Sequence, residues 1–180
     1  TAMLRVMFNS DWFKNARFEK VKSPAETVAG TMRLVQDFTS PKPGLHPIAM
    51  EIRYMGQDLM NPPTVEGWHT GQEWIDSGTL VERINYASDL LGNTELPVVK
   101  GLINRLMRRG DSLSPETFVD GCLDLIGPIT VDDGTRSELV AHAQKAGDLR
   151  HGSSSEQSDF TRRTGEMFQM IASTAEFQFE

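Results

Sequence analysis

Residues 23–38 read Ser-Pro-Ala-Glu-Thr-Val-Ala-Gly-Thr-Met-Arg-Leu-Val-Gln-Asp-Phe, and this stretch decides the fold class. Ser23 suits a helix N-cap, Pro24 the first helical position, and Glu26 completes a capping box by reaching back to the Ser23 N–H. Apolar residues follow on one face at steps of three and four, at Ala25, Val28, Met32, Val35 and Phe38. The stretch therefore predicts an amphipathic α-helix, ended by the segment 37–44 with Pro41 and Pro43.

The same helical spacing recurs along the rest of the chain. It predicts helices over about 45–57, 71–91, 96–109, 114–127 and 130–147, and a last helix from Phe160 to Thr174 that follows a polar run at 151–158. Leu4 to Phe8 reads like the last turns of another helix. Alternation of period two does not persist long enough for a strand. The expected class is all-α, an irregular multi-helix bundle of about seven helices with no sheet beyond two short strands.

Some finer expectations concern the helix ends. Ser114 and the pair Asp132-Asp133 are expected to cap helices, and Gly127-Pro128 to end one. The run Ser153–Ser155 is read as a loop. On the last helix, Arg162 and Arg163 are expected to point away from the buried stripe.

Composition limits the class of protein. The chain has 180 residues with 38% hydrophobic and 24% charged content, which is ordinary for one soluble globular domain. A single domain over 1–180 is expected, with a division into 1–92 and 93–180 as the alternative. The net charge of −7 argues against nucleic acid as a partner, and the absence of a run of about 18 apolar residues argues against a membrane span. Cys122 falls in an apolar helical series and is expected in the core.

The connector over 61–74 has an unusual composition. It reads Asn-Pro-Pro-Thr-Val-Glu-Gly-Trp-His-Thr-Gly-Gln-Glu-Trp, with two prolines, two glycines and two of the three tryptophans. Prolines fix φ, glycines allow positive φ, and large aromatic rings hold a loop against a surface. We therefore expect an ordered loop in which at least one of Trp68 and Trp74 is largely buried.

Polar groups near this loop form the candidate site. A histidine beside carboxylates suits a general base, and tryptophans suit stacking on a sugar or another flat ligand. The structural alternative is stronger, because tryptophans in such loops usually pin the loop, asparagine before proline usually caps or turns, and an arginine such as Arg83 usually pairs with a nearby carboxylate. Three further charged residues belong to this group of polar side chains: Arg53, one helix before the loop, and Glu66 and Glu73, within it. The candidate ligand-binding residues are Asp58, Asn61, Trp68, His69, Trp74 and Arg83.

Motifs for cofactors and catalysis are missing from the sequence. The four histidines, His46, His69, His142 and His151, lack the i, i+4 spacing typical of a metal site on a helix. Phosphate-binding loops and serine-nucleophile motifs are absent. We expect no metal and no cofactor, and we assign no catalytic residue.

Several motifs in fixed order resemble one family. They are Phe8–Phe13, Lys20–Glu26, Met55–Pro63 and Val65-x-Gly67-Trp68, extended by Trp74-Ile75 and Leu80-x-x-Arg83-x-Asn85. Together they resemble the C-terminal part of the bacterial domain-of-unknown-function family 1800. The resemblance covers about Leu4 to Leu91, and residues 172–178 look like the family's usual ending.

The resemblance implies a fragment of a longer bacterial protein. We therefore expect a region N-terminal to Thr1. This region would be the partner of the present chain and would cover part of the loop. The resemblance also makes export plausible, whereas the residues themselves do not fix a compartment. It carries over no activity and no catalytic residue.

Three hypotheses for function follow. The first is a helical scaffold or interaction domain, since the strong signals are helix caps, stops and core stripes. The second is a ligand-binding module, for instance for carbohydrate, centred on Trp68 and Trp74. The third is a non-autonomous part of an exported enzyme with a site near the loop. Exposed indoles lining a groove would favour the second, and buried indoles with satisfied N–H groups the first.

Overall fold

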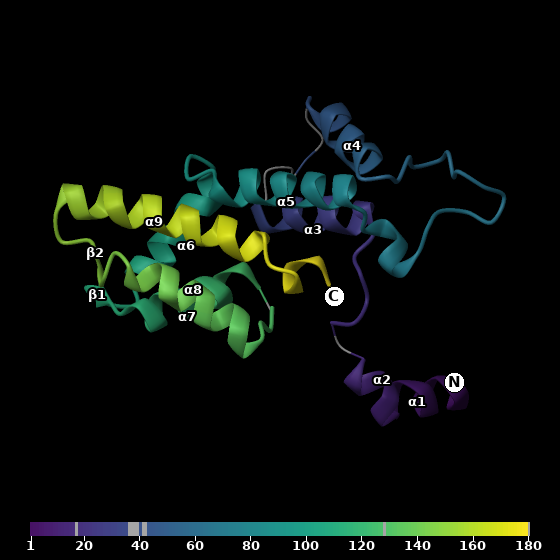
Figure 1. Cartoon of the computed structure of the whole chain (residues 1–180), viewed down its shortest axis with the longest axis horizontal. Helices are drawn as coiled ribbons and strands as arrows, with labels where there is room; N and C mark the ends of the chain where they lie inside the picture. Colours follow the sequence, from purple (N-terminus) through teal and green to yellow (C-terminus); the bar gives the residue numbers. More distant parts are fainter. Residues whose placement is uncertain (17, 36–39, 41–42, 128, 180) are drawn as a thin grey trace.

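The computed structural model describes residues 1–16, 18–35, 40, 43–127 and 129–179, and the fold over these residues is all-α, as predicted (Figure 1). The helices of the described residues are α1 (Ala2–Asn9), α2 (Asp11–Asn15), α3 (Pro24–Val35), α4 (Leu45–Tyr54), α5 (Ser77–Gly92), α6 (Pro97–Met107), α7 (Pro115–Ile126), α8 (Asp133–Gln144) and α9 (Ser154–Ala172). Two 3-10 helices, η1 (Gly71–Trp74) and η2 (Glu176–Gln178), and an antiparallel pair, β1 (Ser112–Leu113) with β2 (Leu149–Arg150), complete the described elements.

Helix α3 begins as its sequence predicts. The Ser23 N–H donates to the Glu26 carboxylate at 2.7 Å, and the Glu26 N–H donates to the Ser23 hydroxyl at 3.3 Å. Val28 and Val35 are buried. Phe38 and the helix-ending residues Asp37 and Pro41 lie outside the described residues, as does the predicted stop at Pro128.

Glu26 makes the stability of α3 sensitive to acid. Burial alone raises the pKa of Glu26, but hydrogen bonds from Lys20 and Ser23 outweigh it and lower the pKa to about 2. A depressed native pKa contributes stability above the unfolded pKa of about 4.3, and this contribution is lost as pH falls toward 2. Because the side chain is 39% exposed, the contribution is about 1 kcal/mol after solvent screening. The free energy of unfolding, measured by urea denaturation between pH 6 and 3, should fall less in Glu26→Gln than in the native chain.

The predicted helix over 71–91 is wrong in its first turn. Gly71–Trp74 is a separate 3-10 helix, Ile75 and Asp76 are extended, and α5 begins at Ser77. The Asp76 carboxylate accepts from the N–H groups of Gly78 and Thr79 at 2.7 and 2.9 Å, so this aspartate is an N-cap and stops the helix from extending backwards. Helices α3 to α9 correspond to the seven longer helices expected, α1 corresponds to the helical turns read at Leu4 to Phe8, and α2 was not anticipated.

The last helix also begins earlier than predicted. Ser153 is its N-cap and Glu156 completes a capping box, so residues 154–158 belong to α9 and not to a loop. The Ser-x-x-Glu spacing is a capping-box pattern, and it was the signal in the sequence from which this earlier start could have been predicted.

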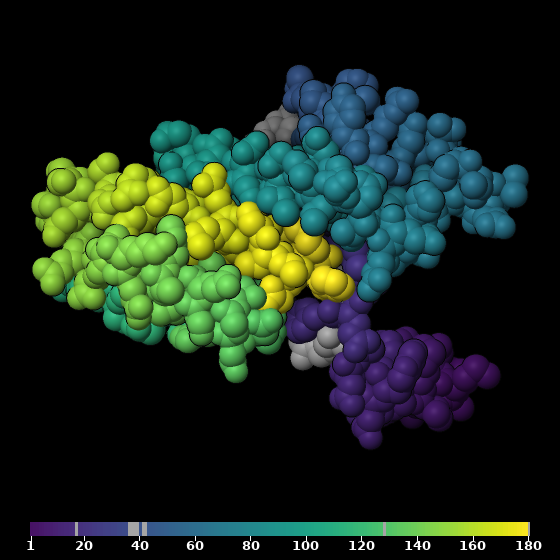
Figure 2. All heavy atoms as spheres, in the orientation of Figure 1, coloured from purple at the N-terminus to yellow at the C-terminus, as the bar shows by residue number. Residues whose placement is uncertain are grey.

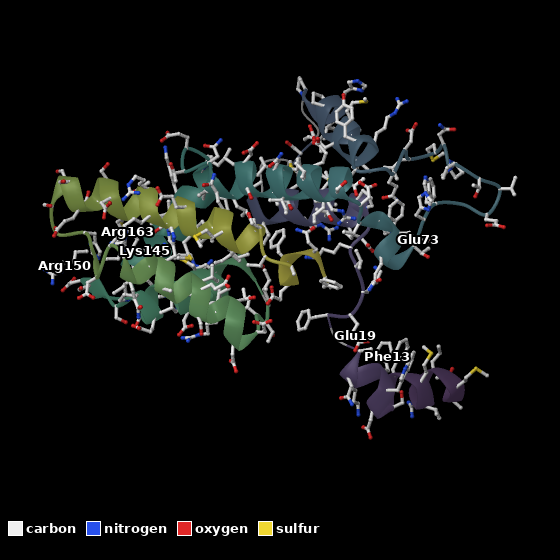
Figure 3. The ribbon with its side chains drawn as sticks, in the orientation of Figure 1. Phe13, Glu19, Glu73, Lys145, Arg150 and Arg163 are labelled. Carbon is white, nitrogen blue, oxygen red and sulfur yellow. The ribbon has the colours of Figure 1, made fainter. Side chains whose placement is uncertain are left out.

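Arg163 is buried, which corrects the expectation that it points away from the core. Its guanidinium donates to the carbonyls of Ala143, Gly147 and Asp148 at 3.3, 2.7 and 3.4 Å, at the C-terminal end of α8 (Figure 3). It therefore supplies donors to a carbonyl in the last turn of α8 and to two carbonyls of the segment that follows. The predicted caps of α7 and α8, Ser114 and Asp132, are confirmed.

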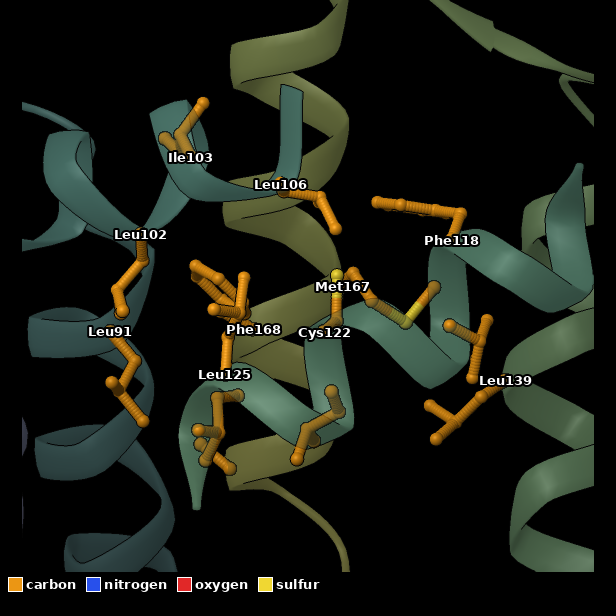
Figure 4. Packing of buried hydrophobic residues seen from close by; sticks show 14 of the residues in the cluster. Leu91, Leu102, Ile103, Leu106, Phe118, Cys122, Leu125, Leu139, Met167 and Phe168 are labelled. Atoms are coloured by element: carbon orange, nitrogen blue, oxygen red, sulfur yellow. The ribbon is translucent and has the colours of Figure 1, made fainter. Parts of the chain in front are cut away.

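The main core lies between α5, α6, α7, α8 and α9 (Figure 4). Cys122 is fully buried there, as predicted, and burial raises the pKa of its thiol far above the usual range. Gly165 lets α9 pack closely against the C-terminal end of α5 and the residues that follow it. A Cβ at this position would lie 2.8 Å from Thr94 Cγ2 and 3.3 Å from the Gly92 carbonyl. A smaller cluster of Val28, Ile52 and Met55 joins α3 and α4.

Two parts of the chain project from the end of the molecule that holds the C-terminal segment. One is the pair α1 and α2, and the other is the connector between α4 and η1 (Figures 1 and 2). Within the described residues, no helix has the length and apolar character that crossing a bilayer would require.

Candidate functional site

The connector between α4 and η1 is closed at its neck by contacts to Asp58. The Trp68 indole N–H donates to the Asp58 carbonyl at 3.2 Å, and the Asn61 amide donates to the Asp58 carboxylate at 3.2 Å. Arg53 Nε lies 3.5 Å from the same carboxylate. The structure thus brings together Asp58, Asn61 and Trp68, and their contacts join the two ends of the segment 58–68.

The far end of this segment turns at residues 64–67. The Gly67 N–H donates to the Thr64 carbonyl at 3.1 Å, and the Thr64 hydroxyl donates to the Gly67 carbonyl at 3.3 Å. Gly67 has φ of +110°, a conformation that side chains rarely adopt. Local hydrogen bonds therefore hold the turn, although its side chains are exposed.

Three apolar side chains of this segment face solvent, Leu59 and Met60 beside the neck and Val65 in the far turn, and we call the three together the apolar tip. Leu59, Met60 and Val65 are 47%, 93% and 108% exposed. Met60 also has φ of +70°, a left-handed conformation that costs on the order of 1 kcal/mol or more in a residue other than glycine. Reasoning from sequence missed this feature, because it looked for polar groups. The available signal was the presence of apolar residues in a connector without helical periodicity.

The second half of the connector places His69 beside Trp74. Their rings meet edge to face at 6.0 Å between centroids, and His69 Nδ1 lies 3.6 Å from the Glu73 carboxylate (Figure 3 shows Glu73). The same carboxylate accepts from the Thr70 N–H at 3.2 Å. Trp74 is only 6% exposed, which confirms that one of the two loop tryptophans is buried.

Arg83 lies on α5 and makes its hydrogen bonds away from the loop. It is fully buried, and it donates to the Thr27 hydroxyl at 2.9 Å and to the Lys22 carbonyl at 2.7 Å. Burial lowers the pKa of Arg83, and the nearby Glu26 carboxylate opposes that shift. The guanidinium thus ties α5 to the start of α3, whereas the other five candidate residues belong to the loop.

The polar groups of the loop are open to water. The His69 and Glu73 side chains are 56% and 66% exposed, so they do not share the enclosed site in which a general base is usually tuned. No group of three or more metal-ligating side chains comes together in the described part of the chain. The most distinctive property of the loop is therefore a fixed backbone that presents apolar side chains.

Replacing Trp68 by phenylalanine should loosen the neck. It removes the indole N–H and leaves the Asp58 carbonyl without that donor, at a cost of about 0.5–1.5 kcal/mol. Hydrogen exchange of the amides of Asn61 and Gly67 should become faster. Trp12→Phe, at an indole that is 74% exposed, serves as the control and should leave the stability and the exchange of these two amides unchanged. Unaltered exchange in Trp68→Phe would show that this bond does not hold the loop.

The described residues thus form an all-α fold with a projecting loop that local hydrogen bonds hold and that exposes apolar side chains. Comparison with models of protein families matches residues 1–179 to DUF1800, described as a protein of unknown function. The chain belongs to this family, and the match extends beyond the motifs of its first half. The curated proteins and the solved structures compared with the chain gave no match.

Proposed function

We propose that this chain is a helical interaction domain, and that the apolar tip of the 58–68 segment contacts a protein partner. The observation that supports this proposal most strongly is the exposure of Leu59, Met60 and Val65 on a backbone fixed by hydrogen bonds. Burying one such side chain contributes about 1.5–3 kcal/mol. Three of them supply a useful part of the free energy of a specific contact.

The closed neck supports this proposal. Association loses free energy when a flexible loop must be ordered, and a loop that is already fixed avoids much of that loss. The Trp68 bond to Asp58 and the 64–67 turn hold the loop before any partner arrives. The polar site residues then act as supports for the tip and not as ligands.

The partner that we propose is a region of the same polypeptide N-terminal to Thr1. The resemblance to longer family members supports this choice. A carbohydrate-binding module is less well supported, because Trp74 is buried and Trp68 already donates its N–H within the loop. Stacking on a sugar requires an exposed ring face.

A charge at the tip should distinguish this chain from the longer polypeptide. Val65→Asp should change the free energy of unfolding of this chain by less than about 0.5 kcal/mol, because the side chain is fully exposed. In the longer polypeptide the same substitution should cost roughly 1–3 kcal/mol, since it places a charge in a contact. Thermal and urea denaturation of both proteins provide the measurement. Equal, small effects in both would contradict the proposal.

A further inference from the structure

Helices α1 and α2 form a projection whose apolar side chains lie in solvent, which we call the apolar hairpin (residues 2–15). None of the residues of the two helices is buried, and Figure 2 shows the hairpin projecting from the rest of the molecule. Phe8 and Phe13 meet edge to face at 4.9 Å, so the two helices pack on each other. Its large apolar side chains remain 41–83% exposed, at Met3, Leu4, Val6, Met7, Phe8, Trp12 and Phe13.

The distribution of these side chains favours a protein surface over a lipid surface. Helix α1 is apolar at positions 2–4 and 6–8, and only Arg5 and Asn9 are polar. At 100° per residue these apolar positions cover most of the circumference. A helix that lies on a bilayer keeps a broad polar face in water, whereas a helix that is apolar on most sides is usually buried in protein.

A groove of matching character lies on the body where the chain enters it from the hairpin. It has a volume of about 520 Å³ and is lined by Val21, Ile75, Leu80, Ile84 and Phe179, among others. Val21 forms an antiparallel bridge with Phe179, so the chain that follows the hairpin is itself part of the groove wall. The groove is large enough for bulky apolar side chains.

Charge also favours a contact between the hairpin and the body of another copy. The hairpin carries Arg5 and Lys14 against Asp11, whereas the whole chain has a net charge of −7, so the remainder is acidic. The hairpin therefore has the opposite sign of net charge to the rest of the chain, which favours its approach to the body of another copy.

We propose that the apolar hairpin of one copy docks into the groove of a second copy, and reciprocally, to form a two-fold dimer. This inference is independent of the proposed function, which concerns the 58–68 segment. A fully buried aromatic ring contributes about 150–250 Å². Allowing for partial burial, Phe8, Trp12 and Phe13 from two hairpins, with the groove surface that they cover, reach on the order of 1,200 Å², the lower range for specific interfaces.

Sedimentation velocity of the 180-residue chain over a range of concentrations tests the dimer. The native chain should show a concentration-dependent dimer, and Trp12→Ser and Leu80→Glu should each raise the dissociation constant by at least about tenfold, or about 1.4 kcal/mol. The matched control is Leu45→Glu, the same substitution at an exposed leucine of α4 that does not line the groove. It should leave the dimer unchanged, and thermal melting checks that each variant is folded. A monomer at every concentration, or a dimer that resists both substitutions, would overturn the proposal.

Cross-linking between copies tests which surfaces meet. The native Cys122 is buried, so single cysteines at position 12 in one copy and position 80 in another provide the reactive thiols. Mixing Trp12→Cys with Leu80→Cys should give a disulfide-linked heterodimer under mild oxidation. Mixing Trp12→Cys with Arg150→Cys, at the opposite end of the molecule (Figure 3), should not. A bond that forms only within one chain carrying both cysteines, or binding of the hairpin to anionic vesicles without a dimer, would refute docking between copies.

Discussion

Replacing Arg83 by alanine is expected to lower the free energy of unfolding by about 3–5 kcal/mol. The side chain is fully buried, and it donates to the Thr27 hydroxyl and the Lys22 carbonyl. Each hydrogen bond from a charged donor contributes about 1.5–3 kcal/mol, and truncation also leaves a cavity. Domains of this size are stable by only about 5–15 kcal/mol, so this loss would be large.

Urea denaturation of three variants separates the contributions at this position. Arg83→Met keeps much of the volume and removes the charge and its bonds, so it should cost less than Arg83→Ala. Arg53→Ala, at an exposed arginine 3.5 Å from Asp58, should cost less than about 1 kcal/mol. If Arg83→Ala were no more destabilising than Arg53→Ala, the link between α5 and the start of α3 would not stabilise the fold.

Replacing Trp74 by alanine is expected to cost about 3–5 kcal/mol, because it removes a large indole that is 94% buried and leaves a cavity where the connector joins α5. The Thr79 hydroxyl also donates to the Trp74 carbonyl at 2.9 Å, so the backbone here is coupled to the cap of α5. Thermal unfolding and hydrogen exchange of η1 provide the measurement.

The other two tryptophans provide controls for that substitution. Trp12→Ala changes the same residue type at a side chain that is 74% exposed in a single copy, and at concentrations where the chain is monomeric it should change stability by less than about 0.5 kcal/mol. Trp68→Ala should be intermediate, since Trp68 is half-buried and donates one hydrogen bond. Equal effects at positions 12 and 74 would show that burial of Trp74 does not anchor the connector.

The helical class was predictable because its signals are local. The capping box of Ser23 and Glu26 depends only on residues three apart, and the structure forms it as expected. The boundary at Asp76 was missed, because the apolar stripe of Leu80, Ile84, Ala87 and Leu91 does not mark where the helix begins, and Asp76 was not recognised as its N-cap. Helix boundaries depend on the competition between side-chain caps and continuation of the helix, and periodicity does not report it.

The candidate site was only partly predictable, since its contacts combine short and long separations. Asp58, Asn61 and Trp68 lie within ten residues, and the structure brings them together. Arg83 binds Thr27, which is 56 residues earlier, and no spacing rule indicates such a partner. The exposure of Met60 and Val65 depends on a backbone that leads the loop away from the body, and composition alone carries no such information.

Thiol reactivity at position 65 tests most directly whether the apolar tip is a contact surface. The Val65→Cys thiol should react with a maleimide at the rate of a free thiol in this chain, because the side chain is fully exposed and the native Cys122 is buried. In a polypeptide that carries the proposed N-terminal region, its rate should fall by at least about tenfold, which corresponds to about 1.4 kcal/mol of protection. The rate at Arg150→Cys should stay the same in both proteins. Equal rates at position 65 in the chain and in the longer polypeptide would contradict the proposed contact.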